Sequence, residues 1–197
     1  MKNEIYIGIT GNRDISEKQI IFIKKRIEEF LNNFKKDNEF SNIIVLTPLA
    51  DGVDRIIANS IIENFSNIKI LVPLQFSESI YKNTFGKGLK INNISQAESI
   101  KEYESLIYKI KKHNKCDDIY INLEFDKENY LNQNIDEQRK IRNEQYYLLG
   151  EYLIEKSDNL IAVYDKNREI KKGSTLEIVN KFDNKKLSNQ KLHKIII

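Results

Sequence analysis

Apolar and β-branched residues gather in three short runs in the first part of the chain, at 4–10, 43–47 and 68–74. Runs of this length and composition are typical of buried strands. The segments between them, 17–36 and about 53–64, carry apolar residues at the spacing of an amphipathic helix. Strands that alternate with helices in this way predict a parallel sheet covered by helices on both faces.

The middle of the chain, about 76–135, is polar and rich in lysine. Its pattern predicts one helix over about 96–113 and one strand over 119–125. Long irregular segments in a compact domain are usually functional or disordered. We therefore expect either an insertion or lid in this part of the chain or one further regular unit of the sheet.

The last third of the chain returns to the first pattern. It predicts a long helix over about 136–156, a buried strand over 159–164, a helix from about Ser174 and a terminal edge strand over 193–197. A chain of 197 residues without internal repeats or low-complexity linkers suits one domain. We therefore expect a single α/β domain over 1–197, Rossmann-like, with a mainly parallel sheet flanked by helices.

Small and polar residues follow three of the predicted strands. They are 10–14 (TGNRD) after the first strand, 48–55 (PLADGVDR) after the second, and 165 with 172–177 (KGSTLE) after the strand at 159–164. In an open parallel sheet the carboxyl ends of the strands face one crevice, where ligands bind. Glycines let backbone amides approach a phosphate, and a helix that begins after such a loop adds unpaired amides. The three loops together predict a pocket for a nucleotide-type ligand.

Several enzyme signatures are missing from the sequence. Neither G-x-G-x-x-G after the first strand nor G-x-x-x-x-G-K-[ST] occurs, which disfavours an ordinary NAD dehydrogenase and a P-loop NTPase. No Ser-His-Asp or Cys-His constellation is legible. The single cysteine, Cys116, excludes an internal disulfide, and we expect His113 and His193 to be exposed among lysines. We expect no metal site and no cofactor.

Charge and hydropathy limit the expected cellular location and partners of the protein. No apolar run approaches the length of about 18 residues that a membrane span needs, and the N-terminus lacks signal-peptide features, so we expect a cytoplasmic protein without a membrane partner. The net charge is +3, but 165–197 holds nine Lys or Arg against four Asp or Glu, a local net of +5. Such a segment is either a solvated basic surface or a surface that attracts an anionic ligand or strand.

Three segments of the chain resemble the SLOG superfamily. They read GITGNRD (8–14), LADGVDR (49–55) and SDNLIAVYD…KKGSTLEIV (157–179). The superfamily includes the LOG phosphoribohydrolases, the DprA DNA-processing proteins, and sensor domains fused to effectors. The chain looks most similar to the bacterial SLOG sensor domains, over about 1–75 and 136–183.

The resemblance carries site residues over to this chain position by position. Asn12 stands where the first loop of the family more often has His, and Ser174 stands where the phosphate loop more often has a second Gly. Residues that match the family, together with residues chosen for their place after a strand or on the helix at 136–156, make up the candidate ligand-binding set. This set is Thr10, Gly11, Asn12, Arg13, Ala50, Gly52, Asp54, Arg142, Tyr146, Asp165, Gly173, Ser174, Thr175 and Glu177.

Two pairs of residues have both a functional and a structural interpretation. Arg142 and Tyr146 lie four positions apart on one helix, which suits phosphate binding with base stacking. A surface arginine beside a core tyrosine gives the same pattern. Tyr81 and Phe85 either line a base pocket or close the core, and the core is the favoured interpretation.

The resemblance implies three functions. The first is a domain that senses a nucleotide-derived signal, for example a cyclic ADP-ribose isomer or a related NAD-derived nucleotide, in bacterial anti-phage signalling. Its expected partners are a second copy in a homo-oligomer and an effector protein or domain. The second is a LOG-like phosphoribohydrolase that cleaves an N-glycosidic bond with Glu177 as the catalytic carboxylate. This chain lacks the full P-G-G-x-G-T-x-x-E motif of those enzymes, which favours the sensor.

The third function is a DprA-like binder of single-stranded DNA. The basic C-terminal third supports it, but stacking platforms for bases are sparse there, with only Tyr164 and Phe182. We therefore rank a nucleic-acid partner last.

Overall fold

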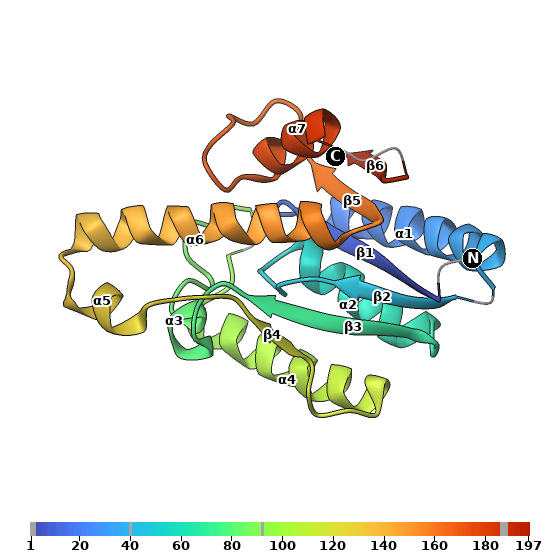
Figure 1. Ribbon diagram of the computed structural model, residues 1–197, viewed down its shortest axis with the longest axis horizontal. Helices are drawn as coiled ribbons and strands as arrows, with labels where there is room; N and C mark the ends of the chain where they lie inside the picture. The colour runs from blue at the N-terminus through green and yellow to red at the C-terminus, as the bar shows by residue number, and fades with distance from the viewer. Residues whose placement is uncertain (1–2, 40, 92, 186–188) are drawn as a thin grey trace.

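A computed structural model of the chain describes residues 3–39, 41–91, 93–185 and 189–197 (Figure 1). Within these residues six strands form one sheet in the order β4-β3-β2-β1-β5-β6, and every neighbouring pair is parallel. The strands are β1 (Glu4–Gly11), β2 (Asn42–Leu46), β3 (Ile68–Leu74), β4 (Tyr120–Asn122), β5 (Asn159–Tyr164) and β6 (Lys191–Ile196). The helices are α1 (Glu17–Asp37), α2 (Val53–Asn64), α3 (Glu78–Lys82), α4 (Gln96–Asn114), α5 (Lys127–Asn132), α6 (Ile135–Lys156) and α7 (Thr175–Lys185).

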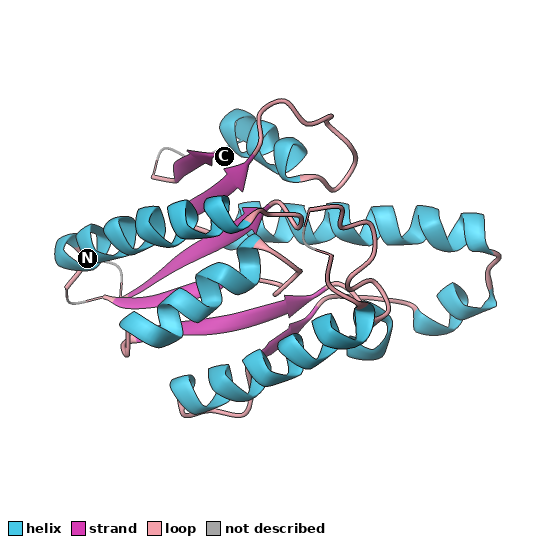
Figure 2. Cartoon of the chain, turned by 180° about the vertical axis from the view of Figure 1, so that it is seen from behind, coloured by secondary structure: helices cyan, strands magenta, loops and turns pink. Residues whose placement is uncertain are grey.

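Helices cover both faces of the sheet. On one face α1 packs against α2 and α2 against α4, as the view from behind in Figure 2 shows. On the other face α6 packs against α7, and both helices contact β1 (Figure 1). The predicted α/β class and the single Rossmann-like domain are confirmed. None of the helices in the described ranges is long and apolar enough to cross a membrane.

The direction in which the sheet grows changes between β1 and β5. From β1 the chain adds β2, β3 and β4 on one side, and it then returns to place β5 and β6 on the other side. The helices that follow β1 and β5, α1 and α7, lie on opposite faces of the sheet. This arrangement is a topological switch point, and it opens a crevice beyond the carboxyl ends of β1 and β5.

Local sequence explains where the two longest helices on the α2 side begin. Ser16 caps α1 by accepting from the amide of Gln19, whose side chain accepts from the amide of Ser16 in return. Ser95 and Glu98 form the same reciprocal capping box at the start of α4. Each box satisfies amides that the first turn of a helix leaves unpaired, so both starts are fixed by the sequence.

Two expectations for individual segments were wrong. The strand expected over 119–125 is limited to the three residues Tyr120–Asn122, because β4 is an edge strand that pairs only with Val72–Leu74. His113 and His193 are half-buried rather than exposed. Both are partly covered because each ring nitrogen reaches an oxygen of a strand residue: His113 Nε2 lies 2.7 Å from the carbonyl oxygen of Ile68, and His193 Nε2 lies 3.1 Å from Asn159 Oδ1.

The middle segment contributes regular structure as well as loops. Strand β4 extends the sheet at its edge, and helix α4 packs against β3. Helix α5 and the first half of α6 project beyond the carboxyl ends of the strands (Figure 1). The aromatic ring of Phe76, just after β3, contacts Tyr146 on α6 with ring centroids 5.5 Å apart and Phe125 with centroids 5.3 Å apart. These contacts anchor the projecting part of α6 to the carboxyl edge of the sheet.

Candidate functional site

The loops after β1 and β2 pack directly against one another. Gly52 has φ +82°, and a Cβ there would overlap the carbonyl oxygen of Arg13. A Cβ on Gly11 would overlap the side chain of Val53, whose amide donates to the carbonyl oxygen of Asn12 at 3.1 Å. Both glycines are therefore required by the close approach of the two loops.

The loop before α7 meets the end of β1 from the other side of the switch point. Thr10 Oγ1 lies 3.4 Å from Thr175 Oγ1, and the amide of Asn12 donates to the carbonyl oxygen of Val163 at 3.0 Å. Gly173 has φ +76°, and a Cβ there would come within 2.7 Å of Tyr146 Cβ. The structure thus brings together the three loops that the sequence singled out.

The first turn of α7 is partly capped by its own side chains. Ser174 Oγ accepts from the amides of Lys171 at 3.1 Å and Glu177 at 3.3 Å. The carboxylate of Glu177 accepts from the amide of Gly173 at 2.5 Å. The amides of Thr175 and Leu176 donate to none of the described residues. The open end of α7 therefore presents two backbone donors and a hydroxyl beside Thr10, which is the usual equipment of an anion site.

The guanidinium of Arg13 is directed toward the β2 loop. Its Nη2 donates to a carboxylate oxygen of Asp51 and to the carbonyl oxygen of Thr84, the latter at 2.9 Å. Asp51 is 4% exposed and also accepts from the hydroxyl of Ser99. Burial raises the pKa of Asp51, but the hydrogen bonds from Ser99 and Arg13 outweigh it and hold the pKa below its ordinary value. Arg13 is thus half-buried and pairs with a buried carboxylate at the rim of the crevice.

Arg55 is the second arginine that Asp51 holds. Its Nε donates to the carbonyl oxygen of Leu49 at 3.1 Å, and its Nη1 donates to the carbonyl oxygen of Ser99 at 3.0 Å. Its guanidinium carbon lies 4.6 Å from the ring centroid of Phe85. These contacts make Arg55 a structural residue that ties the β2 loop to α4.

Asp54 lies in the first turn of α2 and is 4% exposed. One of its carboxylate oxygens accepts from the amide of Ala50 at 3.1 Å. Burial raises the pKa of Asp54 to about 7. Nearby, burial and the charges of Tyr146 and Asp54 raise the pKa of Tyr81, whose buried hydroxyl has no hydrogen-bond partner among the described residues. A carboxyl group that titrates near neutral pH therefore lies beside the β1 and β2 loops.

The segment 83–91, which we call the strap, lies over the first two loops. Asp51 accepts from the amide of Gly86 at 3.2 Å. Asp14 accepts from the amides of Lys90 at 2.8 Å and Ile91 at 2.9 Å. With the bond from Arg13 to Thr84, side chains of the β1 and β2 loops hold the strap at both of its ends.

Two predicted site residues make other contacts. Arg142 Nη1 donates to the hydroxyl of Tyr130 at 2.8 Å and so ties α6 to α5 in the projecting part of the molecule. Asp165 accepts from the amide of Asn167 at 2.9 Å and fixes the turn that follows β5. The hydrogen bond to Tyr130 directs Arg142 toward α5, whereas Tyr146 lies against Gly173 at the crevice.

The residues that sequence reasoning missed are Asp14, Asp51, Thr84 and Ser99. Asp14 and Asp51 stand inside the two loops that were singled out, so their position was a usable signal. Thr84 and Ser99 come from the middle segment, where the sequence carried no motif. Tyr81 and Phe85 are each 1% exposed, in agreement with the core interpretation.

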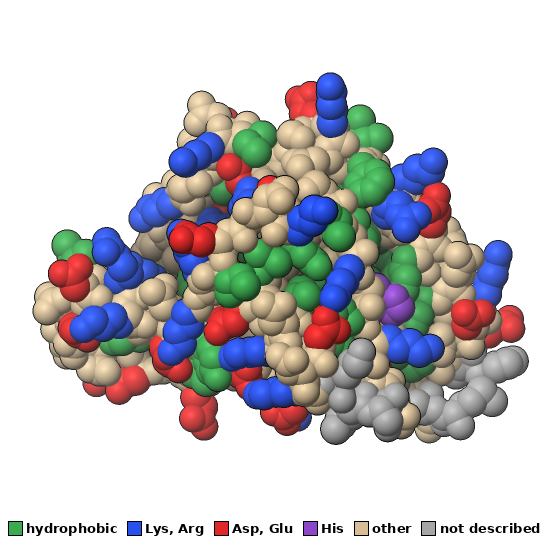
Figure 3. All heavy atoms as spheres, turned by 90° about the horizontal axis from the view of Figure 1, so that it is seen from above, with side chains coloured by type: hydrophobic (Ala, Val, Ile, Leu, Met, Phe, Trp, Pro, Cys, Tyr) green, Lys and Arg blue, Asp and Glu red, His purple; other side chains and the backbone are tan. Residues whose placement is uncertain are grey.

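Several lysines of the basic C-terminal third form ion pairs. Lys181 and Lys185 lie 3.0 Å and 2.6 Å from carboxylate oxygens of Glu151, and Lys194 lies 2.6 Å from Asp183. Figure 3 looks down on this side of the molecule, where basic and acidic side chains alternate around a central group of hydrophobic ones. The local excess of lysine is therefore spread among carboxylates.

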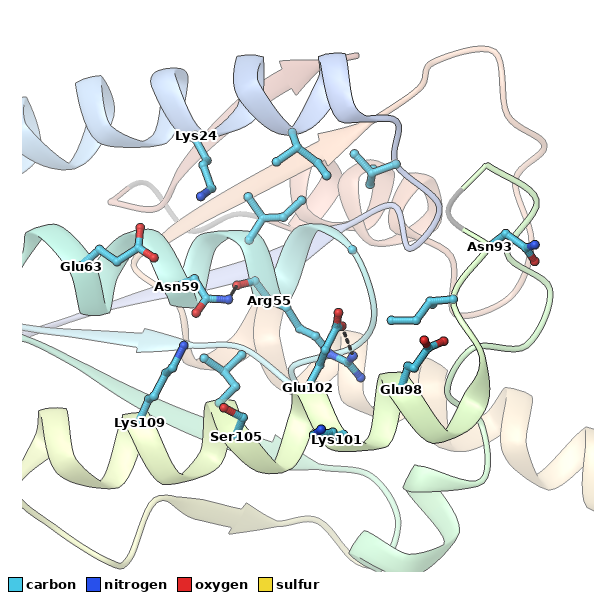
Figure 4. Close-up of a pocket in the computed structure, with 16 residues that line it drawn as sticks. Lys24, Arg55, Asn59, Glu63, Asn93, Glu98, Lys101, Glu102, Ser105 and Lys109 are labelled. Carbon is cyan, nitrogen blue, oxygen red and sulfur yellow. Dashed lines mark hydrogen bonds and ion pairs between the residues drawn. The ribbon is translucent and has the colours of Figure 1, made fainter.

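A large cavity lies away from the crevice. It is a groove of about 910 Å³ between α1, α2 and α4, on the helical layer (Figure 4). Of the predicted site residues, only Gly52 lines it. The groove is thus largely separate from the crevice at the switch point.

Comparison with known proteins assigns no family. No family model matches the chain, and no curated protein matches it with significant similarity. Within the described ranges, no group of three or more His, Cys, Asp or Glu side chains is arranged to hold a metal ion.

Proposed function

We propose that the domain binds a nucleotide-type ligand in the crevice between β1 and β5 and reports its presence as a sensor. The observation that carries the proposal is the junction of Thr10 with Thr175, below two α7 amides that no described residue occupies. A phosphate there would receive two amide donors and two hydroxyls at the positive end of a helix dipole. The resemblance to SLOG sensor domains adds the expectation that the ligand is NAD-derived, such as a cyclic ADP-ribose isomer.

A receptor fits the state of Glu177 better than a hydrolase does. Its carboxylate is held by the amide of Gly173 and lies 3.7 Å from the ammonium of Lys181. A group that stabilises an oxocarbenium-like carbon must face the ligand with its charge available. Here the carboxylate charge of Glu177 is directed to the backbone of its own loop. We therefore assign Glu177 a structural role in holding the conformation of this loop.

The test is a panel of AMP, NAD, ADP-ribose and cyclic ADP-ribose isomers, read by thermal shift and by chromatography of the same samples. A receptor raises Tm with at least one of these ligands, because a ligand that binds the native state stabilises it by mass action. The ligand is then recovered intact. Release of free base and ribose phosphate that is lost in Glu177→Gln would instead identify a phosphoribohydrolase.

Two variants locate the binding site. Thr175→Val removes one hydroxyl of the crevice at nearly constant volume and is expected to weaken binding several-fold. Lys109→Glu alters the large groove between α1, α2 and α4 and is expected to leave nucleotide affinity unchanged. The opposite pattern, with affinity lost in Lys109→Glu and kept in Thr175→Val, would place the ligand in the groove and refute the crevice.

A further inference from the structure

The hydroxyl of Tyr81 is a buried polar group that no described residue satisfies. Tyr81 lies on α3 and is 1% exposed, and its hydroxyl forms no hydrogen bond within the described ranges. Its ring packs against Phe85 and Tyr103, with centroids 4.8 Å and 6.3 Å away. Phenylalanine would fill the same place in the core without the hydroxyl. A buried hydroxyl without a partner costs stability, so its presence points to a bound molecule that satisfies it.

Three other side chains near Tyr81 keep atoms available for hydrogen bonding. One carboxylate oxygen of Asp54 accepts from the amide of Ala50, and the other oxygen has no partner in the described part of the chain. The hydroxyl of Tyr146 forms no hydrogen bond with a described residue. The Nε atom of Arg13 is buried and is likewise unpartnered among the residues that the structure describes.

These four side chains, which we call the polar cluster, lie close together at the carboxyl ends of the strands. The ring of Phe76 contacts both tyrosines, with centroids 6.4 Å from Tyr81 and 5.5 Å from Tyr146. Burial raises the pKa of Tyr81, and the charges of Tyr146 and Asp54 raise it further. The positive charge of Arg13 lowers it. Such effects require that the groups be near one another, because charge interactions weaken with distance.

The polar cluster adjoins the proposed phosphate position at the start of α7. Gly173 lies against Tyr146, since a Cβ on this glycine would come within 2.7 Å of Tyr146 Cβ. Arg13 belongs to the same loop as Thr10, whose hydroxyl lies 3.4 Å from that of Thr175. A group attached to a phosphate at the α7 amides is therefore next to the cluster. In a nucleotide this group is the ribose.

A vicinal diol matches the unpartnered atoms of the polar cluster. Each hydroxyl of a diol both donates and accepts, as a side-chain hydroxyl does. One diol hydroxyl donates to the available oxygen of Asp54 and accepts from Nε of Arg13. The other pairs with the hydroxyls of Tyr81 and Tyr146, which also donate and accept. A ribose thus satisfies groups that the protein alone leaves unpaired.

We propose that the polar cluster binds the ribose diol of the nucleotide through Tyr81, Tyr146, Asp54 and Arg13. The inference rests on the proposed function and narrows its ligand to nucleotides with free 2′- and 3′-hydroxyls beside the bound phosphate. A cyclic isomer whose linkage uses either of these oxygens lacks the diol and is excluded. The strap follows α3 directly and is tied to Arg13 at Thr84, so it moves aside when the ligand enters.

The test compares AMP with 2′,3′-dideoxy-AMP, which keeps the base and the phosphate and lacks only the diol. Isothermal titration calorimetry with the full chain is expected to show AMP binding at least about tenfold more tightly. A site built to pair with hydroxyls discriminates strongly against a ligand without them, because its own buried polar groups then stay unpaired.

Tyr81→Phe removes the hydroxyl and keeps the ring. AMP is expected to bind this variant about fivefold more weakly, whereas 2′,3′-dideoxy-AMP is expected to bind it as it binds the unmodified chain. Without ligand, Tyr81→Phe is expected to have a higher Tm, because a buried unpartnered hydroxyl has been removed. A tyrosine with only a structural role gives neither the difference between the two nucleotides nor the gain in Tm.

Two further variants complete the test. Asp54→Asn is expected to weaken AMP binding, since a neutral amide oxygen accepts less strongly than a carboxylate oxygen. Tyr103→Phe is the matched control. Tyr103 is 0% exposed in the same group of rings, but its hydroxyl interacts mainly with Tyr120. This variant is expected to bind both nucleotides within twofold of the unmodified chain.

The possible failures are distinguishable. Equal affinity for AMP and 2′,3′-dideoxy-AMP would refute the diol site and leave the nucleotide site in place. A Tyr81→Phe variant that is less stable without ligand would show that water already satisfies the hydroxyl, and this too would overturn the inference. If no nucleotide of the panel binds, the proposed function and the diol site are refuted together.

Discussion

The Nη2 atom of Arg55 lies 3.1 Å from Oδ1 of Asp51, and both side chains are more than nine-tenths buried. The other carboxylate oxygen of Asp51 takes the guanidinium of Arg13. Two arginines, one from the rim of the crevice and one from the floor of the groove, therefore share a single buried carboxylate. Their mutual repulsion is tolerated because this anion lies between them.

Asp51→Asn is expected to destabilise the protein by about 3–5 kcal/mol, because it removes the buried carboxylate that the buried Arg55 and the half-buried Arg13 share. Urea unfolding followed by circular dichroism measures the loss. The matched control is Glu29→Gln, which breaks the exposed pair that Arg26 forms with Glu29 at 3.2 Å. That pair is expected to contribute less than about 1 kcal/mol. Equal losses in the two variants would contradict the role given to Asp51.

Gly52→Ala is expected to cost about 3 kcal/mol or more, since the new Cβ meets the carbonyl oxygen of Arg13 and the residue keeps φ +82°. Gly88→Ala separates the two causes. Gly88 has φ +75°, but a Cβ there meets nothing within 4 Å, so only the backbone strain of about 1 kcal/mol remains. Thermal or urea unfolding of both variants gives the difference, and a Gly88→Ala loss as large as that of Gly52→Ala would show that packing of the two loops is not the cause.

Asp54→Asn is expected to flatten the dependence of stability on pH between about 4 and 7. The folded pKa of about 7 lies above the ordinary value of 3.8, so the folded state binds more protons than the unfolded chain in this window. Its contribution to stability is then present at low pH and lost as pH rises through 7, by up to about 1.4 kcal/mol per pH unit. Urea unfolding at pH 5, 6, 7 and 8 measures it.

The comparison with the unmodified chain isolates Asp54 from groups of opposite sign. Burial lowers the pKa of His193 below 6.5, so its contribution is lost as pH falls, and it is present in both proteins. The expected signature is a variant that gains stability relative to the unmodified chain as pH rises to 8. Parallel pH profiles for the two proteins would mean that Asp54 titrates near its ordinary value.

Ser174→Ala is expected to cost about 1 kcal/mol, because the hydroxyl accepts from the amide of Glu177 at the start of α7. Ser105→Ala is the matched control. Ser105 is exposed inside α4, where alanine is the better helix former, so that change is expected to be neutral or slightly stabilising. Differential scanning calorimetry of both variants measures the two changes in stability. An unchanged stability in Ser174→Ala would show that Ser174 does not stabilise the start of α7.

The periodicity of apolar residues predicted most of the fold. β1, β3, β5 and the long helices begin and end within about two residues of the predicted bounds, because each has a continuous apolar run or a helical stripe that only burial explains. The crevice was also predictable in outline, since the carboxyl ends of parallel strands must share one edge. The length of β4 could not be predicted. It depends on how many residues of β3 pair with it, and these are Val72–Leu74.

The partners of the polar site residues could not be predicted. Arg13 belongs to the candidate ligand-binding set, and its observed partners are Asp51 and the carbonyl oxygen of Thr84. That choice depends on the path of the strap, which carries no periodic pattern or motif in the sequence. The groove could not be predicted from the sequence either, because it is formed by three helices that lie side by side and not by any one of them.

The strap is held through its main chain and through the ring of Phe85, which is 1% exposed and packs against Tyr81 and Tyr103. Its contacts with Arg13, Asp51 and Asp14 use the carbonyl oxygen of residue 84 and the amides of residues 86, 90 and 91. Its course also depends on Gly86 at φ +68° and Gly88 at φ +75°, whereas Lys87 and Lys90 are exposed. Divergent descendants of this chain can therefore change the exposed side chains that the strap offers to a ligand while its path is inherited unchanged, which makes those positions the natural place for new specificities to evolve.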